Sequence, residues 1–564
     1  MAEARTVQQQ AGAPPEKPAD NTKKPYMVDY PTLGKIGLFR SPIGEVHATF
    51  NIGDRHETLP VESKQFLDIL AFRFYREQGA VPSKRELKEI VRDLSWIGKF
   101  DGPELPLFIR YGKIGSTVYV DLCDHLGHYV KIDPEGWNIH RHDVDSPAFI
   151  RHPGMLPQVK PERGGSIAEL EAFLNTKREG QFVLVVAFIL GAMHPDGPFP
   201  MLLLNGPQGS SKSTMLRIIR SLIDPSEAAL TSEPRSKRDL FISARNAYMH
   251  CIDNVSSLSQ KMADAYCQLV TEGVFRTRKL YTSLEEVIIR VKRPVAFNGI
   301  TSFANQNDFL DRSIVMRLLG IDAAARQPER DFWETWKIAL PRVLGAFYDA
   351  VAAALKNQDQ VQLASMPRMA DFARWVAAAE PACPWQAGEF ERVYESNRNE
   401  IIDTAIEDDP IGEAVLYLLR DKAKWSGTPT ELLRVLKKVT AEELQKDTDW
   451  PKAPNTLSTR LMRLEGFLAT KKVAIARDRR SDKRVIKLTK AVQEIAEERP
   501  EWTRKGNEPY FLPTRVAEKP QARAEDFTMK EVENAEKSPG FDGEPADIQV
   551  VETKSAAKYE EGSI

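Results

Sequence analysis

The chain has 564 residues, which at about 150 residues per domain predicts three or four domains. Charged residues make up 28% and hydrophobic residues 42%, a composition typical of a chain that folds around hydrophobic cores. The 78 Lys and Arg nearly balance the 80 Asp and Glu, and the net charge of −2 excludes a uniformly basic protein that coats DNA. Local basic surfaces remain possible, because a whole-chain sum averages them out.

The cysteines and the apolar runs indicate a cytoplasmic protein with no membrane partner. Cys123, Cys251, Cys267 and Cys383 stand far apart and form no CxxC pair, which argues against a zinc ribbon or a disulfide framework. The N-terminal segment has no apolar signal core. The longest apolar run, residues 182–193, is shorter than the roughly 20 residues of a membrane-spanning helix, so we expect a buried helix there.

Composition and periodicity divide the chain into segments. Residues 1–25 and 515–564 lack apolar periodicity and are expected to be disordered. Residues 26–160 predict an α+β domain, with strands in GEVHATFNI and TVYVDL and a helix in KQFLDILAFRFYREQG. Residues 155–165, punctuated by Pro and Gly, predict a linker.

The second half of the chain predicts three further units. Residues 166–325 alternate helix and strand, beginning with a helix that Ser166 and Glu169 cap as a capping box. Residues 326–405 are typical of a helical lid or connector, and 410–490 of a separate folded unit.

A glycine-rich loop is the strongest functional signal. It consists of Gly206, Pro207, Gln208, Gly209, Ser210, Ser211, Lys212, Ser213 and Thr214. The loop follows an apolar strand, 201–204, and precedes an amphipathic helix, which is the context of a P-loop that binds ATP. Backbone N–H groups would surround the phosphates, Lys212 would reach the β- and γ-phosphates, and the Ser213 hydroxyl would bind Mg²⁺. The usual pattern has Gly where Ser211 stands.

A second strand, 247–252, ends at Asp253 and Asn254 and predicts a Walker B motif. Asp253 is expected to hold Mg²⁺ through water. Many such ATPases have Glu where Asn254 stands, and an amide orients water but accepts no proton. Hydrolysis is then slow, or another carboxylate such as Glu233 serves as the base.

A third strand, 293–297, ends at Asn298, which is expected to lie between the two motifs and contact the γ-phosphate. Arg312 follows in the segment DFLDRS and is a candidate arginine finger for the ATP of a neighbouring subunit. The alternative is a surface ion pair between Arg312 and Asp308 or Asp311.

This order of motifs resembles the AAA+ ATPases, and is most similar to the superfamily 3 and minichromosome-maintenance-like helicases of phages and mobile elements. The motifs are LLLNGPQGSSKST, CIDNVSSLS, RTRKLY, RPVAFNGI and DFLDRSIVMRL. The resemblance implies an α/β AAA+ core with a parallel sheet, in a homo-hexameric ring that couples ATP hydrolysis to movement on DNA. By the same resemblance the roles fall to Lys212, Ser213, Asp253, Asn298 and Arg312, with Arg368 as a possible second sensor.

A predicted β-hairpin lies between the Walker B and third strands, in residues 276–292. In the helicases that it resembles, a hairpin at this place points into the ring channel. Because Glu285 and Glu286 sit near the turn, the expected contacts to single-stranded DNA move to Arg276, Arg278 and Lys279. The alternative is a solvated basic strand edge.

Residues 410–490 predict a winged-helix-like domain that binds duplex DNA. Leu457, Leu461 and Leu464 share one face of a helix, and two strand-like runs follow it. Between 460 and 490, 11 Lys and Arg face 3 acidic residues, a local excess typical of phosphate binding. The expected DNA contacts are Arg460, Arg463, Arg479, Arg480, Lys483 and Arg484. The alternative is a protein interface.

The leading hypothesis is therefore an ATP-dependent DNA helicase or translocase that acts in replication of a phage or mobile element. The alternative is a non-translocating ATPase switch, such as a helicase loader or an origin-binding regulator. A primase–helicase fusion is a third interpretation, which depends only on Asp143 and Asp145 next to His140 and His142.

Overall fold

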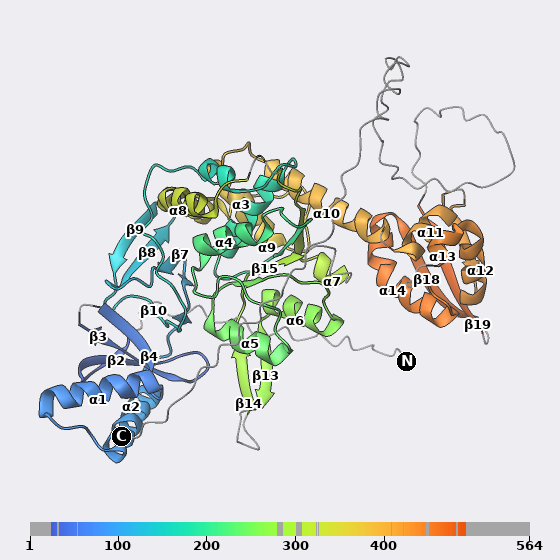
Figure 1. Cartoon of the computed structure of the whole chain (residues 1–564). Helices are drawn as coiled ribbons and strands as arrows, with labels where there is room; N and C mark the ends of the chain where they lie inside the picture. Colours follow the sequence, from blue (N-terminus) through green and yellow to red (C-terminus); the bar gives the residue numbers. More distant parts are fainter. Residues whose placement is uncertain are drawn as a thin grey trace, which may run out of the picture. The chain divides into compact units, whose positions relative to one another are not determined.

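The computed structural model describes residues 24–30, 33–53, 55–278, 286–299, 307–322, 324, 326–407, 409–420, 422–446, 450–480 and 483–491. The segments predicted to be disordered, 1–25 and 515–564, lie outside these residues apart from Lys24 and Pro25. Figure 1 labels the elements in chain order.

The N-terminal segment begins with a four-stranded antiparallel sheet that two helices cover (Figure 1). Its elements are β1 (Tyr26–Tyr30), β2 (Gly34–Arg40), β3 (Val46–Ile52), β4 (Arg55–Pro60), α1 (Lys64–Gln78) and α2 (Lys84–Phe100). Ser63 and Ser83 cap the two helices with their side-chain oxygens. Phe66 and Leu70 of α1 are buried, so the predicted helix and its apolar face are confirmed.

A second antiparallel sheet follows, with strands in the order β6–β7–β8–β9. Its strands are β6 (Tyr111–Ile114), β7 (Thr117–Asp121), β8 (His128–Asp133) and β9 (Gly136–Arg141), and the short β5 (Leu107–Phe108) and β10 (Ala148–Phe149) pair beside it. The buried Val118 and Val130 belong to the same hydrophobic cluster as the following α/β unit. Residues 26–160 therefore hold one sheet with its own core and one that shares the core of the next unit.

The segment 155–165, predicted to be a linker, forms no helix or strand, but it is anchored to the following unit at single points. The side-chain amide of Gln158, which is 4% exposed, donates to the carbonyl oxygens of Ser221 and Leu222 at 3.0 Å each. The backbone N–H of Glu162 donates to the carbonyl of Pro341. Pro and Gly set the path of the segment, but composition does not show where its backbone hydrogen bonds go.

A parallel four-stranded sheet forms the centre of the next unit, in the order β12–β15–β11–β16. The strands are β12 (His250–Ile252), β15 (Val295–Gly299), β11 (Met201–Asn205) and β16 (Ser313–Arg317). Every residue of β11 is buried, as predicted for a strand covered on both faces. Leu202 and Leu204 point into one hydrophobic cluster, and Met201 and Leu203 into another.

Helices cover the two faces of this sheet. On the first face lie α3 (Gln181–Ala192), the predicted buried helix, and α4 (Lys212–Ile223); on the second lie α5 (Lys237–Asn246) and α6 (Gln260–Thr271). Between α6 and β15 the chain forms the strand pair β13 (Val274–Arg278) and β14 (Glu286–Arg290), and the short α7 (Asn307–Leu310) precedes β16.

Two elements differ from their prediction. β12 is shorter than the predicted strand 247–252, because the N–H groups of Tyr248 and Met249 donate to the carboxylate of Asp224, at 3.1 Å each, instead of a neighbouring strand. The helix predicted to start after Ser166 is a 3₁₀ helix, Ile167–Phe173, and its capping box with Glu169 is present as predicted.

Three helices fill the segment predicted to be helical: α8 (Glu329–Asn357), α9 (Ala370–Ala379) and α10 (Glu389–Glu407). By length and composition α8 is the one helix among the described residues that is apolar enough to cross a membrane, but 67% of its apolar window is buried in the protein. Trp336 and Phe347, for example, are part of the core. On α10, the side chain of Asn397 bonds both the N–H and the carbonyl of Val315, and so caps the edge of the parallel sheet.

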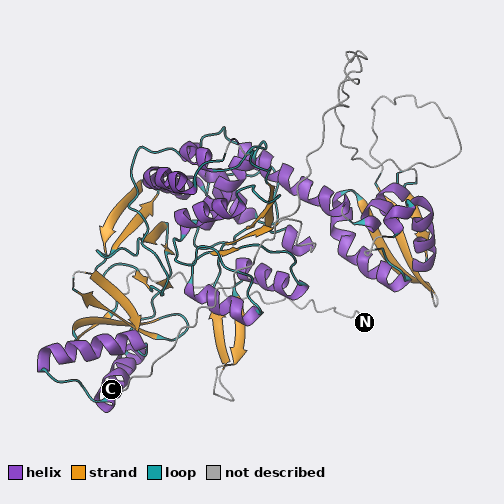
Figure 2. Cartoon of the chain, in the orientation of Figure 1, coloured by secondary structure: helices purple, strands orange, loops and turns teal. Residues whose placement is uncertain are grey.

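The C-terminal unit combines helices with a three-stranded antiparallel sheet (Figure 2). Its elements are α11 (Pro410–Leu418), β17 (Lys424–Gly427), α12 (Pro429–Val439), α13 (Glu442–Gln445), α14 (Pro454–Thr470), β18 (Val473–Arg480) and β19 (Lys483–Lys490). Leu457, Leu461 and Leu464 are all buried, which confirms the predicted face of α14. The predicted order of helices followed by a hairpin is also confirmed.

Candidate nucleotide-binding site and basic surfaces

The loop between β11 and α4 has a fixed backbone shape. A Cβ on Gly206 would lie 2.7 Å from the carbonyl oxygen of Leu318, and Gly209 has a φ of +75°. Ser210 is buried and donates its hydroxyl to the carbonyl of Pro207 at 2.8 Å. Gln208 is exposed in the loop, and Thr214 lies in the first turn of α4. The glycines are therefore required by close approach at 206 and by backbone conformation at 209.

Ser211 occupies a left-handed backbone conformation, with φ 57° and ψ 26°. Glycine adopts this conformation without strain, whereas an L-residue with a side chain costs about 1–2 kcal/mol. The departure from the usual glycine thus places a strained residue immediately before Lys212.

Lys212 lies folded over the loop. Its Nζ donates to the carbonyl oxygens of Gly206 and Pro207 at 2.8 Å each, and lies 3.4 Å from the Ser210 hydroxyl oxygen. Burial lowers the pKa of Lys212 below its usual value, although Asp253 opposes that shift. The ammonium is therefore held by neutral acceptors at the N-terminus of α4.

The structure brings Ser213, Asp253 and Asn298 into one hydrogen-bonded cluster. The Ser213 hydroxyl donates to Asp253 Oδ1 at 3.0 Å. Asn298 Nδ2 donates to Asp253 Oδ1 at 2.5 Å and to Ser213 Oγ at 3.1 Å, and its Oδ1 accepts from the backbone N–H of Asn254 at 2.6 Å. The cluster forms because β12 and β15 are adjacent and parallel, so their carboxyl ends meet beside the start of α4. A carboxylate and a hydroxyl are oxygen ligands of the kind that Mg²⁺ prefers.

Asn254 has a structural reason to be an asparagine. Its φ is +57°, a left-handed conformation in which Asn is several-fold enriched among non-glycine residues. Glu233, the other carboxylate considered, lies two residues beyond Thr231, whose carbonyl accepts from the N–H of Asp253 at 2.8 Å. Burial raises the pKa of Glu233, so its environment favours a carboxyl that takes up a proton.

Arg312 makes an ion pair within its own chain. It donates to the carbonyl of Asp308 at 2.8 Å and pairs with the carboxylate of the same residue. Arg368 pairs with Asp308 at 2.5 Å and with Asp311 at 3.4 Å. Arg312 is thus in the ion pair that the alternative describes, and Arg368 pairs with the same carboxylate.

Two further residues shape the loop without belonging to any motif. The side-chain amide of Asn175, which is 8% exposed, donates to the carbonyl of Ser210 at 3.1 Å and to that of Leu319 at 2.7 Å. The guanidinium of Arg326 lies 3.4 Å from the point where a Cβ on Gly209 would sit. Both residues are distant from the loop in sequence, so no local pattern marks them.

The predicted hairpin is confirmed as β13 and β14, with Arg276 opposite Ile288 and Val274 opposite Arg290. Arg276 is exposed, and Phe275 packs against the core from the opposite face of its strand. The backbone of Arg278 ends β13, but its side chain and all of Lys279 lie outside the described residues.

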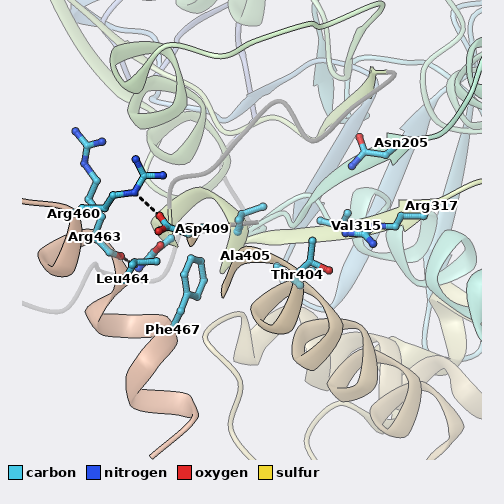
Figure 3. Close-up of a pocket in the computed structure, with 13 residues that line it drawn as sticks. Asn205, Val315, Arg317, Thr404, Ala405, Asp409, Arg460, Arg463, Leu464 and Phe467 are labelled. Atoms are coloured by element: carbon cyan, nitrogen blue, oxygen red, sulfur yellow. Dashed lines mark hydrogen bonds and ion pairs between the residues drawn. The ribbon is translucent and has the colours of Figure 1, made fainter. Parts of the chain in front are cut away.

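The cations of the C-terminal unit are partly paired. Arg460 pairs with Asp409 at 2.7 Å, and this carboxylate also caps α11 (Figure 3). Arg460 and Arg463 line a cavity of about 270 Å³ together with Arg317. Further ion pairs are Lys471–Asp403, Arg477–Glu465 and Lys487–Asp478, so the free excess of charge is smaller than the sequence count.

Four of the predicted DNA contacts lie at the tip of the C-terminal hairpin. Arg484 is exposed. The backbones of Arg479, Arg480 and Lys483 belong to β18 and β19, but their side chains lie outside the described residues.

The carboxylates at Asp143 and Asp145 lie in a polar loop. Asp143 accepts from the Ser146 hydroxyl at 2.7 Å and from the N–H of Asp145 at 3.0 Å. In the part of the chain that the structure describes, no group of three or more His, Cys, Asp or Glu side chains is placed to hold a metal ion. Local hydrogen bonds therefore account for the carboxylate of Asp143.

Comparison with known proteins gives two family matches and a set of similar structures. Three solved structures of the NrS-1 C-terminal region are similar to the chain; the first has a TM-score of 0.35, 11% identity and covers 81% of this chain and 97% of that one. A second has a TM-score of 0.33 and 10% identity, covering 80% and 96%. No curated protein matches the chain.

One family match covers the unit around the parallel sheet together with α8, α9 and part of α10, and the other covers the C-terminal unit. Residues 166–398 match the model of the actinomycete integrative conjugative element replication protein, RepA. Residues 411–507 match the model of the C-terminal domain of the same protein. The chain therefore belongs to the RepA family of actinomycete integrative conjugative elements, and is a replication protein of such a mobile element.

Proposed function

We propose that the chain is a Mg²⁺-dependent AAA+ ATPase that works as a ring-shaped DNA helicase or translocase in replication of its element. The observation that carries this proposal is the arrangement at one edge of the parallel sheet. The glycine-rich loop, Lys212 and the Ser213–Asp253–Asn298 cluster meet there, as ATP with its metal ion requires.

Each residue of the arrangement has a role in this proposal. Lys212 exchanges the carbonyls of Gly206 and Pro207 for oxygens of the β- and γ-phosphates. Ser213 and Asp253 would hold Mg²⁺, which would supply positive charge to offset that of the phosphates. Asn298 positions both ligands and faces the γ-phosphate.

The proposal also needs a base that takes a proton from the attacking water. Asn254 orients water but accepts no proton. Glu233 is the candidate base, because it lies on the segment beside β12 and burial raises its pKa. Glu233→Gln should therefore lower ATP turnover while leaving ATP affinity unchanged.

The proposal also assigns residues to subunit assembly and to DNA binding. Arg312 leaves Asp308 and reaches the ATP of the next subunit in a homo-hexamer, and Arg368 serves as a second sensor. Single-stranded DNA contacts Arg276 on the hairpin β13–β14, and duplex DNA contacts the C-terminal unit through Arg463 and Arg484.

Strand displacement on forked DNA tests the translocase directly. Wild-type protein with Mg²⁺ and ATP should release the labelled strand, and Arg312→Ala should bind ATP without releasing it. Mixing Arg312→Ala with Lys212→Ala should restore part of the activity, because mixed rings pair an intact loop with an intact finger. No recovery in mixtures shown to form mixed rings would contradict the role of Arg312 in trans.

Asn254 favours a second candidate, a non-translocating ATPase switch that loads or regulates another replication protein. In that case ATP binding, rather than turnover, sets the DNA affinity. The forked-DNA assay separates the two, because a switch retains ATP-dependent DNA binding but displaces no strand.

A further inference from the structure

A second cavity, distant in sequence from the glycine-rich loop, lies between the N-terminal sheet and the hairpin β13–β14. Its volume is about 620 Å³, within the roughly 300–1,000 Å³ of small-molecule sites. The wall is formed by the Ser41–Glu45 turn, β5, β6 and β14. We call it the hairpin cavity.

One side of the hairpin cavity is apolar and accessible. Ile43 is 46% exposed and Ile288 is 36% exposed, and both line the cavity with Leu107, Phe108 and Ile150. Two large aliphatic side chains left open to solvent in this way offer a surface for a flat apolar group, and Phe108 adds an aromatic ring.

The other side of the hairpin cavity is cationic. Five cations line it against two carboxylates: Lys113, Arg245, Arg290, Lys292 and Arg293 against Glu45 and Asp196. Both carboxylates are already paired, Glu45 with Arg245 at 2.6 Å and Asp196 with Lys113 at 2.8 Å. Arg290 is exposed and has no ion-pair partner among the described residues. The rim therefore has positive charge that its own carboxylates do not balance.

The hairpin connects this cavity to the predicted DNA contact. Residues directly opposite each other in an antiparallel pair share a face, and Arg276 lies opposite Ile288. Ile288 and Arg290 are two apart on β14, so they lie on the same face as Arg276. One hairpin face thus presents Arg276 together with the apolar and cationic side chains of the cavity.

A buried histidine, His47, lies behind the wall of the hairpin cavity. His47 Nδ1 lies 3.0 Å from the carbonyl of Glu45, which only accepts, so Nδ1 carries the proton. Burial lowers the pKa of His47 and keeps the ring neutral. Its Nε2 is then an acceptor, and it has no partner in the described part of the chain.

We infer that the hairpin cavity binds an unpaired nucleotide, with its base against Ile43, Ile288 and Phe108 and its phosphate at the rim of Arg290 and Lys292. The same chemistry is offered by a nucleotide within single-stranded DNA and by a free mononucleotide. This inference rests on the proposed handling of DNA, but not on ATP hydrolysis.

The test uses the full chain and a short oligothymidylate that carries 5-iododeoxyuridine. Irradiation should cross-link it to Phe108 or its neighbours, as mapped by mass spectrometry. Ile43→Trp fills the cavity and should abolish this cross-link and weaken oligonucleotide binding by about tenfold, the loss of one stacked base. Ile338→Trp, the same change on a residue of α8 that is 76% exposed, should leave both unchanged.

A separate variant tests the cationic rim of the hairpin cavity. Arg290→Ala should flatten the slope of log affinity against log salt by about 0.7, the value of one phosphate contact on a single strand. Arg330→Ala, on the exposed surface of α8, is the matched control and should not change the slope. Circular dichroism checks that all four variants fold.

Excess deoxythymidine monophosphate separates the two sources of the nucleotide. Failure to displace the oligonucleotide supports a site for the DNA strand, whereas displacement and protection from cross-linking support a site for a free nucleotide. Cross-links that map only elsewhere, with Ile43→Trp binding as wild type, would overturn the inference. Lys212→Ala should retain the cross-link, so failure of the proposed ATPase is distinguishable from failure of this site.

Discussion

Asn298 is the residue through which the strand ends and the glycine-rich loop are joined, and replacing it with alanine should damage both stability and turnover. Asn298 is 2% exposed and makes three hydrogen bonds, to Asp253, Ser213 and the N–H of Asn254. A neutral hydrogen bond contributes about 1 kcal/mol, and one to a charged group about 1.5–3 kcal/mol. Asn254 is exposed, so water can replace the hydrogen bond that its backbone N–H loses. Loss of the other two bonds should lower the free energy of unfolding of Asn298→Ala by about 2–3 kcal/mol.

The effect on turnover should be larger than this loss of stability explains. Without Asn298, only the direct hydrogen bond of 3.0 Å between Ser213 and Asp253 remains to orient these two side chains. We expect ATP turnover under saturating Mg²⁺-ATP to fall by roughly 10²-fold, as when one fixed polar group is removed from an active site.

Asn397 provides a matched control on the same sheet. It is 7% exposed and makes two hydrogen bonds to the backbone of Val315 on β16, at the opposite edge of the sheet from β12. Asn397→Ala should lose similar stability in urea unfolding but keep its turnover at temperatures where it is folded. Equal turnover in the two variants, or an Asn298→Ala enzyme within about twofold of wild type, would refute the role of Asn298.

Three further predictions follow from the same structure. Ser211→Gly should raise the unfolding free energy by up to about 1 kcal/mol, because relief of the left-handed strain exceeds the entropy that glycine adds to the unfolded chain; a lower urea midpoint would contradict this. Arg110→Met, which removes one partner of the fully buried Arg110–Asp224 pair, should cost about 3–5 kcal/mol at neutral pH. Burial alone would raise the pKa of Asp224, but Arg220 and Arg110 outweigh burial and hold that pKa below its usual value. The contribution of the carboxylate is therefore complete above the usual pKa of Asp and is lost as the pH falls through the lowered one. Urea unfolding across pH should therefore show the cost shrinking in acid, and a constant cost would be evidence against the pair. Replacing Arg479, Arg480, Lys483 and Arg484 with Ala should flatten the salt dependence of duplex binding by about 0.9 per lost phosphate contact; an unchanged slope with lost assembly would instead make this tip a protein interface.

The sequence alone was enough to predict those elements that a single local pattern determines. The apolar run of α3 and the apolar strand β11 predicted their own burial, and the three leucines of α14 predicted its inner face. The hairpin β13–β14 was predictable for the same reason, since alternation along each arm requires no knowledge of the rest of the fold.

The parts that could not be predicted depend on contacts between distant residues. The packing of residues 155–165 depends on carbonyls of α4 and α8, and the short β12 depends on the carboxylate of Asp224. Asn175 reaches the glycine-rich loop only in the folded chain. In the same way, the acidic partners Asp403 and Asp409 of the basic C-terminal unit lie outside the window in which its charge was counted.

The most direct test of the central claim is Mg²⁺-dependent ATP hydrolysis by the purified chain, with and without single-stranded DNA, in wild type and in Lys212→Ala. Lys337→Ala, on the exposed surface of α8, controls for the loss of a lysine. The account predicts hydrolysis by wild type and Lys337→Ala that DNA stimulates, and none by a correctly folded Lys212→Ala. Hydrolysis that survives Lys212→Ala, or a folded wild-type protein that neither binds nor hydrolyses ATP, would contradict it.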